Sequence, residues 1–268
     1  MKRLENRVAI ITGAGAGIGK GIARRYAAEG AALVLAEYNA ATGRQAAEEV
    51  RRDFGVTAEF VHADVSRRAD VAAMVATTLE RFGKVDILVN NAWGRRPGSP
   101  FAARVELQSE DDLEHAWRIG ALSALWAMQA VFPAMRAQRW GRIVNLCSLN
   151  GVNAHPFTVD YNMAKEALRT LTRTAAREWA PYQICCNVIC PGAATEAYRN
   201  FAEANPENAA AMLKLNPMGR MGDPEADIGS VALFLASEDC RYLTGNTLFV
   251  DGGSHINGVP WSPQLPES

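Results

Sequence analysis

The sequence predicts an α/β fold, in which a parallel sheet is covered by helices on both faces. The first observation is that short apolar runs alternate along the chain with longer amphipathic segments, which is typical of βαβ units. The second is that these runs are almost entirely apolar, as expected of strands buried on both faces. The third is the length of 268 residues without an internal repeat, and we expect one domain spanning residues 1–268.

Seven apolar runs are the predicted strands, at residues 7–11, 32–36, 56–61, 85–89, 143–147, 184–189 and 246–250. The predicted helices cover residues 17–29, 40–53, 67–82, 110–137, 158–180 and 224–236. Two segments, 92–108 and 193–222, do not follow this alternation and both leave strand ends. Ligands of open α/β sheets bind beyond the carboxyl ends of strands, so we expect both segments to border a pocket. The second is predicted to be a helical lid.

Composition excludes several classes of partner. The net charge of −1 gives no reason to expect nucleic acid or a membrane surface, and no apolar run approaches the roughly 18 residues of a membrane span. The five cysteines include the adjacent Cys185 and Cys186 in an apolar run, which indicates core thiols of a reducing compartment. We therefore expect a cytoplasmic protein. No cysteine pair has zinc-like spacing, so no metal site is predicted.

A glycine-rich stretch, TGAGAGIG at residues 12–19, lies between the first strand and the first helix. Glycine allows a tight turn and a close approach of the backbone to a phosphate, and the helix N-terminus offers free N–H groups. The spacing differs from G-x-G-x-x-G, so the position between strand and helix is the stronger argument. The stretch predicts a site for the phosphates of a dinucleotide.

Acidic and amide residues follow the next strands. Glu37 ends the second strand, where a carboxylate accepts hydrogen bonds from ribose hydroxyls and repels a 2′-phosphate. This favours NAD over NADP. Asp64 and Val65 follow the third strand, and Asn90 and Asn91 the fourth, at the same edge of the sheet. We expect these residues to lie beside the adenosine and the rest of the cofactor.

The stretch DYNMAK places Tyr161 and Lys165 four residues apart, and therefore on one face of a helix, thirteen residues after Ser148. A free phenol has a pKa near ~10, and a nearby cation lowers it toward the range of an efficient base. Both Lys165 and a positively charged nicotinamide meet this requirement. Ser148 follows the fifth strand, where its hydroxyl is expected to meet the same substrate oxygen. The alternative is a helix-surface pair with a serine cap.

Taken in order, TGAGAGIG, Asn90-Asn91-Ala92, Ser148, YNMAK and Pro191-Gly192 with Thr195 resemble the short-chain dehydrogenase/reductase family, over residues 6–253. The resemblance implies a three-layer Rossmann fold with seven parallel strands. It implies Tyr161 as the acid/base, Lys165 on the nicotinamide ribose and Ser148 on the substrate oxygen. The cofactor residues that it implies are Gly13, Gly17, Ile18, Gly19, Glu37, Asp64, Val65, Asn90, Asn91, Tyr161, Lys165, Pro191, Gly192 and Thr195.

Two positions depart from the family pattern. Gly120 stands on a predicted helix where many members carry an asparagine that helps to link the lysine to solvent through a water. An asparagine at position 120 is expected to fit sterically. Trp93 follows Asn90-Asn91-Ala92 where the family has glycine. It is expected to cover the nicotinamide, to line the substrate side, or to anchor its loop.

The substrate is the least defined part of the prediction. Trp93, Asn150, His155 and Tyr198 are the candidate contacts, with a locally hydrogen-bonded loop as the alternative for His155. The tail, 254–268, is expected to follow a surface or to be disordered. The nearly apolar segment 121–135 indicates burial on two sides, and the resemblance implies dimers or tetramers.

The sequence leaves three functions open. The favoured one is an NAD-dependent oxidoreductase that interconverts a secondary alcohol and a ketone. The alternatives are an NADP-dependent carbonyl reductase and a protein that binds NAD without turnover, which Gly120 keeps open.

Overall fold

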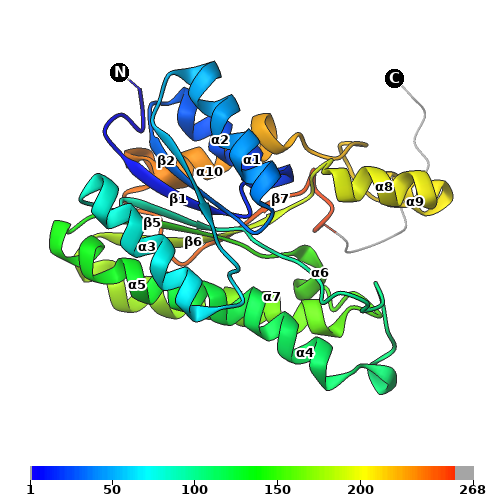
Figure 1. Ribbon diagram of the computed structural model, residues 1–268. Coiled ribbons are helices and arrows are strands. Elements are labelled where there is room, and N and C mark those ends of the chain that lie inside the picture. The colour runs from blue at the N-terminus through cyan, green and yellow to red at the C-terminus, as the bar shows by residue number, and fades with distance from the viewer. Residues whose placement is uncertain (1, 257–268) are drawn as a thin grey trace.

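A seven-stranded parallel sheet forms the centre of the computed structural model, which describes residues 2–256. The strand order is β3-β2-β1-β4-β5-β6-β7, so the chain reverses direction across the sheet between β1 and β4 (Figure 1). This confirms the predicted three-layer Rossmann fold. The strands are β1 Val8–Thr12, β2 Ala32–Glu37, β3 Ala58–His62, β4 Ile87–Asn90, β5 Gly141–Leu146, β6 Ile184–Pro191 and β7 Thr247–Val250.

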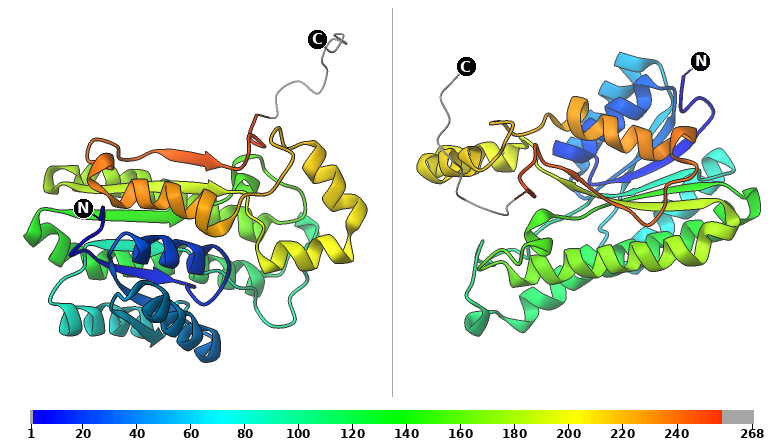
Figure 2. Two further views of the ribbon diagram at one scale, coloured as in Figure 1. Left: turned by 90° about the horizontal axis from the view of Figure 1, so that it is seen from above. Right: turned by 180° about the vertical axis from the view of Figure 1, so that it is seen from behind.

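Helices cover both faces of this sheet, as Figure 2 shows. One layer consists of α1 Gly17–Ala28, α2 Ala40–Phe54 and α10 Gly229–Ala236. The opposite layer contains α3 Arg68–Phe82, α5 Ser123–Gln138 and α7 Val159–Trp179. Successive residues of a strand point to opposite faces. Accordingly, Ala9 and Ile11 pack with the first layer, whereas Ile10 packs with the second.

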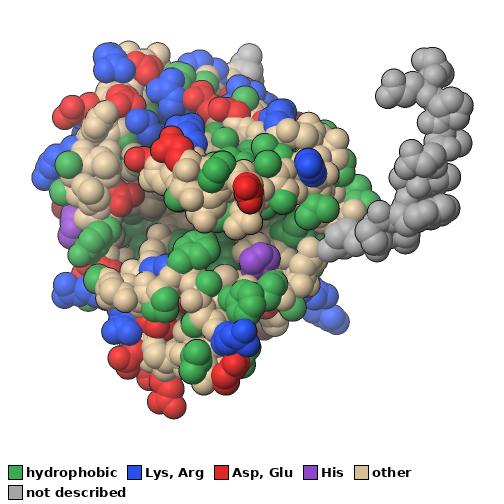
Figure 3. Space-filling view, turned by 90° about the vertical axis from the view of Figure 1, so that its right-hand side faces the viewer, with side chains coloured by type: hydrophobic (Ala, Val, Ile, Leu, Met, Phe, Trp, Pro, Cys, Tyr) green, Lys and Arg blue, Asp and Glu red, His purple; other side chains and the backbone are tan. Residues whose placement is uncertain are grey.

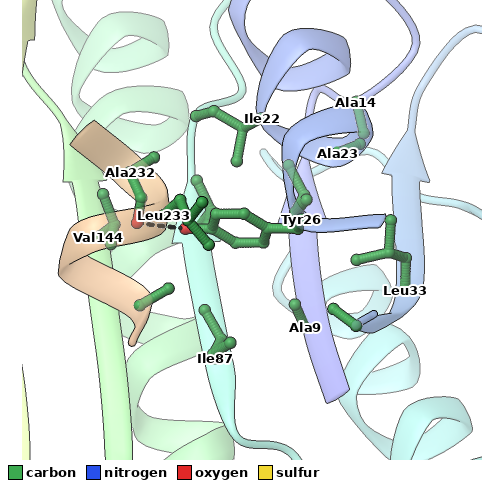
Figure 4. Packing of buried hydrophobic residues seen from close by; sticks show 14 of the residues in the cluster. Ala9, Ala14, Ile22, Ala23, Tyr26, Leu33, Ile87, Val144, Ala232 and Leu233 are labelled. Atoms are coloured by element: carbon green, nitrogen blue, oxygen red, sulfur yellow. Dashed lines mark hydrogen bonds between the residues drawn. The ribbon is translucent and has the colours of Figure 1, made fainter. Parts of the chain in front are cut away.

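Tyr26 of α1 shows how the first layer is fixed. Its ring is completely buried between α1 and the sheet, and its hydroxyl donates a hydrogen bond to the Ala232 carbonyl of α10 at 2.9 Å (Figure 4). Burial raises the pKa of this phenol far above its ordinary value. The hydroxyl therefore acts as a permanent donor that ties α10 to α1.

The predicted helix at 110–137 is wrong in one respect, because the structure divides it. Glu110–Trp117 forms α4, Arg118–Leu122 forms a π-helical turn, and α5 begins at Ser123. Gly120 lies in the middle of the π turn. Such turns occur frequently at functional sites. A second π turn, Pro224–Ile228, replaces the first part of the helix expected at 224–236.

The two irregular segments project from the carboxyl end of the sheet. Segment 193–222 contains two short helices, α8 Glu196–Ala204 and α9 Pro206–Lys214, which extend away from the sheet at the right of Figure 1. The Ala103 N–H donates to the Phe157 carbonyl, which joins segment 92–108 to the loop that contains the short helix α6, Leu149–Val152. Most of the tail lies outside the described residues.

A chain of buried polar side chains crosses the centre of the sheet. The Asn90 amide of β4 donates to the Asn145 side chain of β5 at 2.8 Å, and Asn145 donates to the Thr172 hydroxyl of α7 at 2.8 Å. All three side chains are buried. They connect the strands beneath the candidate active site to the helix that supplies Tyr161 and Lys165.

Candidate active site

A cleft of about 900 Å³ opens at the carboxyl ends of the strands. Figure 3 looks onto this end of the molecule, where the surface is hollowed and hydrophobic side chains gather around the hollow. The lining begins at the glycine loop after β1, passes the ends of β2 and β3, and reaches Tyr161, Lys165 and Pro191. One continuous cleft thus joins the predicted phosphate site to the predicted reaction site.

The glycine loop has the tight backbone that its sequence predicts. Gly13 and Gly17 adopt positive φ angles of 64° and 53°. A Cβ on Gly19 would lie 2.2 Å from the Gly13 carbonyl oxygen, so only glycine allows α1 to approach the loop this closely. Ala16, at the N-cap of α1, makes no side-chain capping bond, and no acidic residue lies in the first turn. The free N–H groups at this end are suited to an anion.

The two asparagines after β4 have different roles. The Asn91 side-chain amide donates to the carbonyls of Thr12 and Gly13 at 2.9 and 3.1 Å, so it holds the glycine loop against β4. Asn91 also lines the cleft. Asn90 does not line it, because its side chain points into the buried contact with Asn145. Asn90 thus supports the cleft from below, and its contribution to cofactor binding stays a prediction.

Two acidic residues border the other end of the cleft. Glu37 accepts hydrogen bonds from the Gly15 and Asn39 backbone N–H groups, each at 3.0 Å, so its carboxylate is fixed beside the glycine loop. Asp64 accepts bonds from the N–H and hydroxyl of Ser66 at 3.0 and 2.6 Å. Both carboxylates retain lone pairs for a ligand, since each oxygen accepts more than one bond.

The helix α7 brings Tyr161 and Lys165 together, as their spacing predicts. Lys165 is only 4% exposed, and its ammonium donates to the Leu146 carbonyl of β5 at 2.8 Å. The nitrogen lies 5.6 Å from the centroid of the Tyr161 ring. Because Leu146 is the last residue of β5, the strand end fixes the lysine directly beneath the phenol.

Ser148 lies two residues beyond the end of β5. Its hydroxyl oxygen accepts a bond from the Asn150 N–H at 3.1 Å and thereby caps α6, so the serine-cap alternative is also correct. A hydroxyl that accepts a bond still has its own proton to donate. Ser148 lowers the pKa of the Tyr161 phenol, which indicates that the serine hydroxyl lies near the phenol.

Burial dominates the electrostatics of this pair. It raises the pKa of the Tyr161 phenol, and the nearby Ser148 hydroxyl and Arg95 oppose this shift only in part. Burial also lowers the pKa of Lys165. The combined effect of Lys165 and a positively charged nicotinamide on the phenol stays a prediction for the protein with its cofactor bound.

The sequence-predicted residues divide into two groups in the structure. Those that line the cleft are Gly13, Gly17, Ile18, Glu37, Asp64, Val65, Asn91, Trp93, Tyr161, Lys165, Pro191 and Thr195. Those outside the lining are Gly19, Asn90, Ser148, Asn150, His155, Gly192 and Tyr198. Gly192 packs against Asp251, where a Cβ would lie 3.1 Å from the Asp251 Cα.

Three of the four candidate substrate residues lie outside the lining. His155 is exposed, its carbonyl accepts bonds from Thr158 and from Asn162 of α7, and its Nδ1 lies 3.5 Å from the Thr158 hydroxyl, which agrees with the alternative of local hydrogen bonding. Asn150 is engaged with Ser148, and the Tyr198 N–H donates to Thr195 at 3.2 Å. Trp93 is the candidate that remains.

Sequence reasoning missed two residues on the reaction side of the cleft, His115 and Ile119. They lie four residues apart, where α4 passes into the π turn, and this spacing places them on one helix face. The His115 Nε2 lies 3.1 Å from the Gly94 carbonyl oxygen. Arg95 also lines the cleft, and it forms an ion pair with Asp160 at 3.4 Å.

Comparison with known proteins identifies the family of the chain. A family model described as enoyl-(acyl carrier protein) reductase matches residues 13–255. A 12α-hydroxysteroid dehydrogenase from a Clostridium species is 36% identical over 255 residues, covering 93% of this chain and 96% of that protein. The chain belongs to the short-chain dehydrogenase/reductase family.

Other members of the family confirm the fold and the enzyme class. An L-fucose dehydrogenase from Oryctolagus cuniculus is 34% identical, over 96% of this chain and 88% of that protein. The crystal structure of levodione reductase superposes with a TM-score of 0.88 at 31% identity, covering 95% of this chain and 99% of the other. The protein is therefore an oxidoreductase of the alcohol dehydrogenase and ketoreductase type.

Residues 2–256 contain neither a cluster of metal-ligating side chains nor a membrane-spanning helix. No group of three or more His, Cys, Asp or Glu residues in this range is arranged to hold a metal ion. No helix in the same range is long and apolar enough to cross a membrane.

Proposed function

We propose that the protein is an NAD-dependent oxidoreductase that interconverts a secondary alcohol and a ketone, with Tyr161 as the acid/base. The observation that carries the proposal is the single cleft joining the glycine loop and Glu37 to Tyr161 and Lys165. Its residues suit a dinucleotide, because α1 presents uncapped N–H groups and Glu37 and Asp64 stand where a ribose and a base would follow.

The preference for NAD is supported by the charges at the adenosine end. Glu37, Tyr38, Asp64 and Ser66 line this part of the cleft, and the only lysine and arginine among the described lining residues are Arg95 and Lys165, near Tyr161. A 2′-phosphate would therefore meet a carboxylate and no compensating cation. The NADP-dependent carbonyl reductase is the weaker alternative for this reason.

In the proposed reaction the bound dinucleotide supplies the hydride acceptor. Tyr161 takes the proton of the substrate hydroxyl during oxidation and returns it during reduction. Ser148 donates a hydrogen bond to the same substrate oxygen. Lys165, fixed by the Leu146 carbonyl, would support the phenolate and hold the nicotinamide ribose when the cofactor is bound. In both directions the protein contributes position and proton transfer.

The test is Tyr161→Phe, with Tyr242→Phe as the matched control because Tyr242 is fully exposed. We expect Tyr161→Phe to reduce turnover by at least about 10²-fold while NAD still binds, since one proton-transfer group contributes roughly 10²–10⁴-fold. Substrates are found by screening sugars, hydroxyacids, steroids and aryl alcohols with NAD. Substantial turnover by Tyr161→Phe on an accepted substrate would refute the acid/base role.

Assembly and location are part of the same proposal. The side chains of Trp126, Gln129 and Ala130 on α5 border a shallow hollow with Arg68 and Ala72 of α3. We expect this face to contribute to a homodimer or homotetramer, which sedimentation measures directly. All five cysteines are free and buried, which supports the expectation of a cytoplasmic protein.

A further inference from the structure

Trp93 and Gly120 pack against one another at the floor of the reaction site. A Cβ built on Gly120 would lie 2.9 Å from Cζ3 and 3.5 Å from Cε3 of the Trp93 indole, and 2.8 Å from the Ala164 Cβ. The indole therefore occupies the volume that a side chain at position 120 would need. The expectation that an asparagine fits there is wrong.

The backbone on both sides of Trp93 is fixed. The Ala92 N–H donates to the Thr12 hydroxyl at 3.1 Å, and the Gly94 carbonyl oxygen lies 3.1 Å from His115 Nε2. These contacts hold the stretch of backbone from which the Trp93 ring projects toward Gly120. The π turn at Arg118–Leu122 supplies the opposite wall.

In this place the indole contacts both residues of the proposed acid/base pair. It meets the Tyr161 ring edge to face, with the centroids 4.7 Å apart and the planes at 77°. The Lys165 nitrogen lies 5.2 Å from the centroid of the indole, within the range of a cation–π interaction. One side chain thus touches the phenol and faces the ammonium at once.

Lys165 has few polar partners besides this aromatic surface. An ammonium group has three donors, and the Leu146 carbonyl is the one hydrogen-bond acceptor that its nitrogen meets among the described residues. The indole and the phenol ring lie next to the nitrogen on other sides. The orientation of the ammonium therefore depends on one carbonyl and two aromatic rings.

We propose that Trp93 is a positioning residue for Tyr161 and Lys165. Its indole holds the two side chains in place from the space that the missing side chain at Gly120 leaves open. The expected effect of Trp93 on turnover rests on the proposed function. The contacts of Trp93 with Tyr161 and Lys165 do not depend on it. Trp93 also shields Tyr161 and Lys165 from water. This shielding contributes to the burial that raises the pKa of Tyr161.

The first experiment follows the ionisation of Tyr161 without any substrate. The near-ultraviolet difference spectrum is recorded against pH, and the Tyr161→Phe spectrum is subtracted to isolate this phenol. Trp93→Ala should move the titration to lower pH, because water then reaches the phenol and the ammonium. Trp93→Phe, which keeps an aromatic face, should restore most of the wild-type value. Trp126→Ala is the matched control, since Trp126 lies on α5 away from the cleft.

The second experiment is a double-mutant cycle of Trp93→Ala with Gly120→Ala, measured by melting temperature and by turnover. Gly120→Ala alone displaces the indole and should lower turnover. In the Trp93→Ala background, Gly120→Ala should lower turnover by a factor about tenfold smaller than it does in the wild type. A coupling of this size is expected for residues in contact. The contact with the Ala164 Cβ is present in both backgrounds and cancels in the cycle.

The outcomes separate this inference from the proposed function. An unchanged Tyr161 titration in Trp93→Ala, or additive effects in the cycle, overturns the role of Trp93 even when Tyr161→Phe abolishes turnover. A shifted titration with a coupled cycle supports it even when Tyr161→Phe retains activity, a result that would refute only the catalytic assignment. If Gly120→Ala does not fold, the titration of Trp93→Ala and Trp93→Phe still decides the question.

Discussion

Replacing the Glu37 carboxylate by an amide tests the choice of cofactor. Glu37→Gln preserves the size of the side chain but removes its charge, and an amide oxygen can accept only one of the two N–H bonds from Gly15 and Asn39 without placing its NH₂ group against the other. The lost bond weakens the loop for both dinucleotides alike. The lost charge removes the repulsion of the 2′-phosphate of NADP and weakens the hydrogen bonds to the ribose hydroxyls of NAD, and both effects lower the preference for NAD.

The magnitude follows from the charge separation at this edge of the cleft. Two unit charges 4 Å apart repel by about 1 kcal/mol in water and about 4 kcal/mol at an effective dielectric constant near ~20. Glu37 is half-buried and its neighbour Tyr38 is exposed, so the lower part of this range applies. Because about 1.4 kcal/mol corresponds to a factor of ten, we expect the ratio of the Kd for NADP to the Kd for NAD to fall by about tenfold.

The assay is a titration of each dinucleotide by isothermal calorimetry at low and moderate salt. Glu59→Gln serves as the control, because Glu59 is a neighbouring acid on β3 that pairs with Arg81 outside the cleft. The Kd ratio should be unchanged in the control. If wild-type protein binds NADP as tightly as NAD, or if Glu37→Gln leaves the ratio unchanged, the reasoning from charge is wrong.

Three further predictions each concern one side chain. Lys165→Met should lower turnover by at least about 10²-fold. Because burial holds the folded-state pKa of Lys165 below its ordinary value of 10.5, the wild type gains stability as pH rises through that folded pKa toward 10.5, and the variant lacks this gain. The stability of the variant relative to wild type should therefore decline over this range in urea titrations, and a constant difference would contradict the argument. Ser148→Ala should lower kcat by roughly 10²-fold with unchanged NAD affinity, as for loss of one donor to a reacting oxygen, and an unaffected kcat would remove Ser148 from the mechanism. Tyr26→Phe leaves the buried Ala232 carbonyl without its donor and should cost about 1–3 kcal/mol, or several degrees in Tm, with NAD binding intact; an unchanged melting curve would show that α10 does not depend on this bond.

The sequence was most informative where the chain obeys a local rule. The apolar runs gave the seven strands to within a few residues, and the spacing of Tyr161 and Lys165 gave their common helix face. Glycine positions such as Gly13 and Gly19 were predictable because tight turns and close packing leave no alternative residue. These features depend on neighbours within one or two elements.

The sequence was least informative where two distant segments share one volume. Trp93 and Gly120 lie 27 positions apart, and nothing in either segment shows that the indole fills the space above the glycine. The π turn was not predicted either, because its local sequence is typical of an ordinary helix. Asn90 was assigned to the cofactor because its position at a strand end does not show whether the side chain points into the cleft or into the sheet.

The buried polar chain from the Asn90 and Asn145 amides to the Thr172 hydroxyl holds the site in place before a substrate binds. It cross-braces β4, β5 and α7, so none of the three can slide without breaking a bond shielded from water. The distance between the glycine loop and the phenol is consequently established during folding, and an arriving substrate meets a preorganised framework. Backbone amides of β4 and β5 should exchange with deuterium only when the whole domain unfolds.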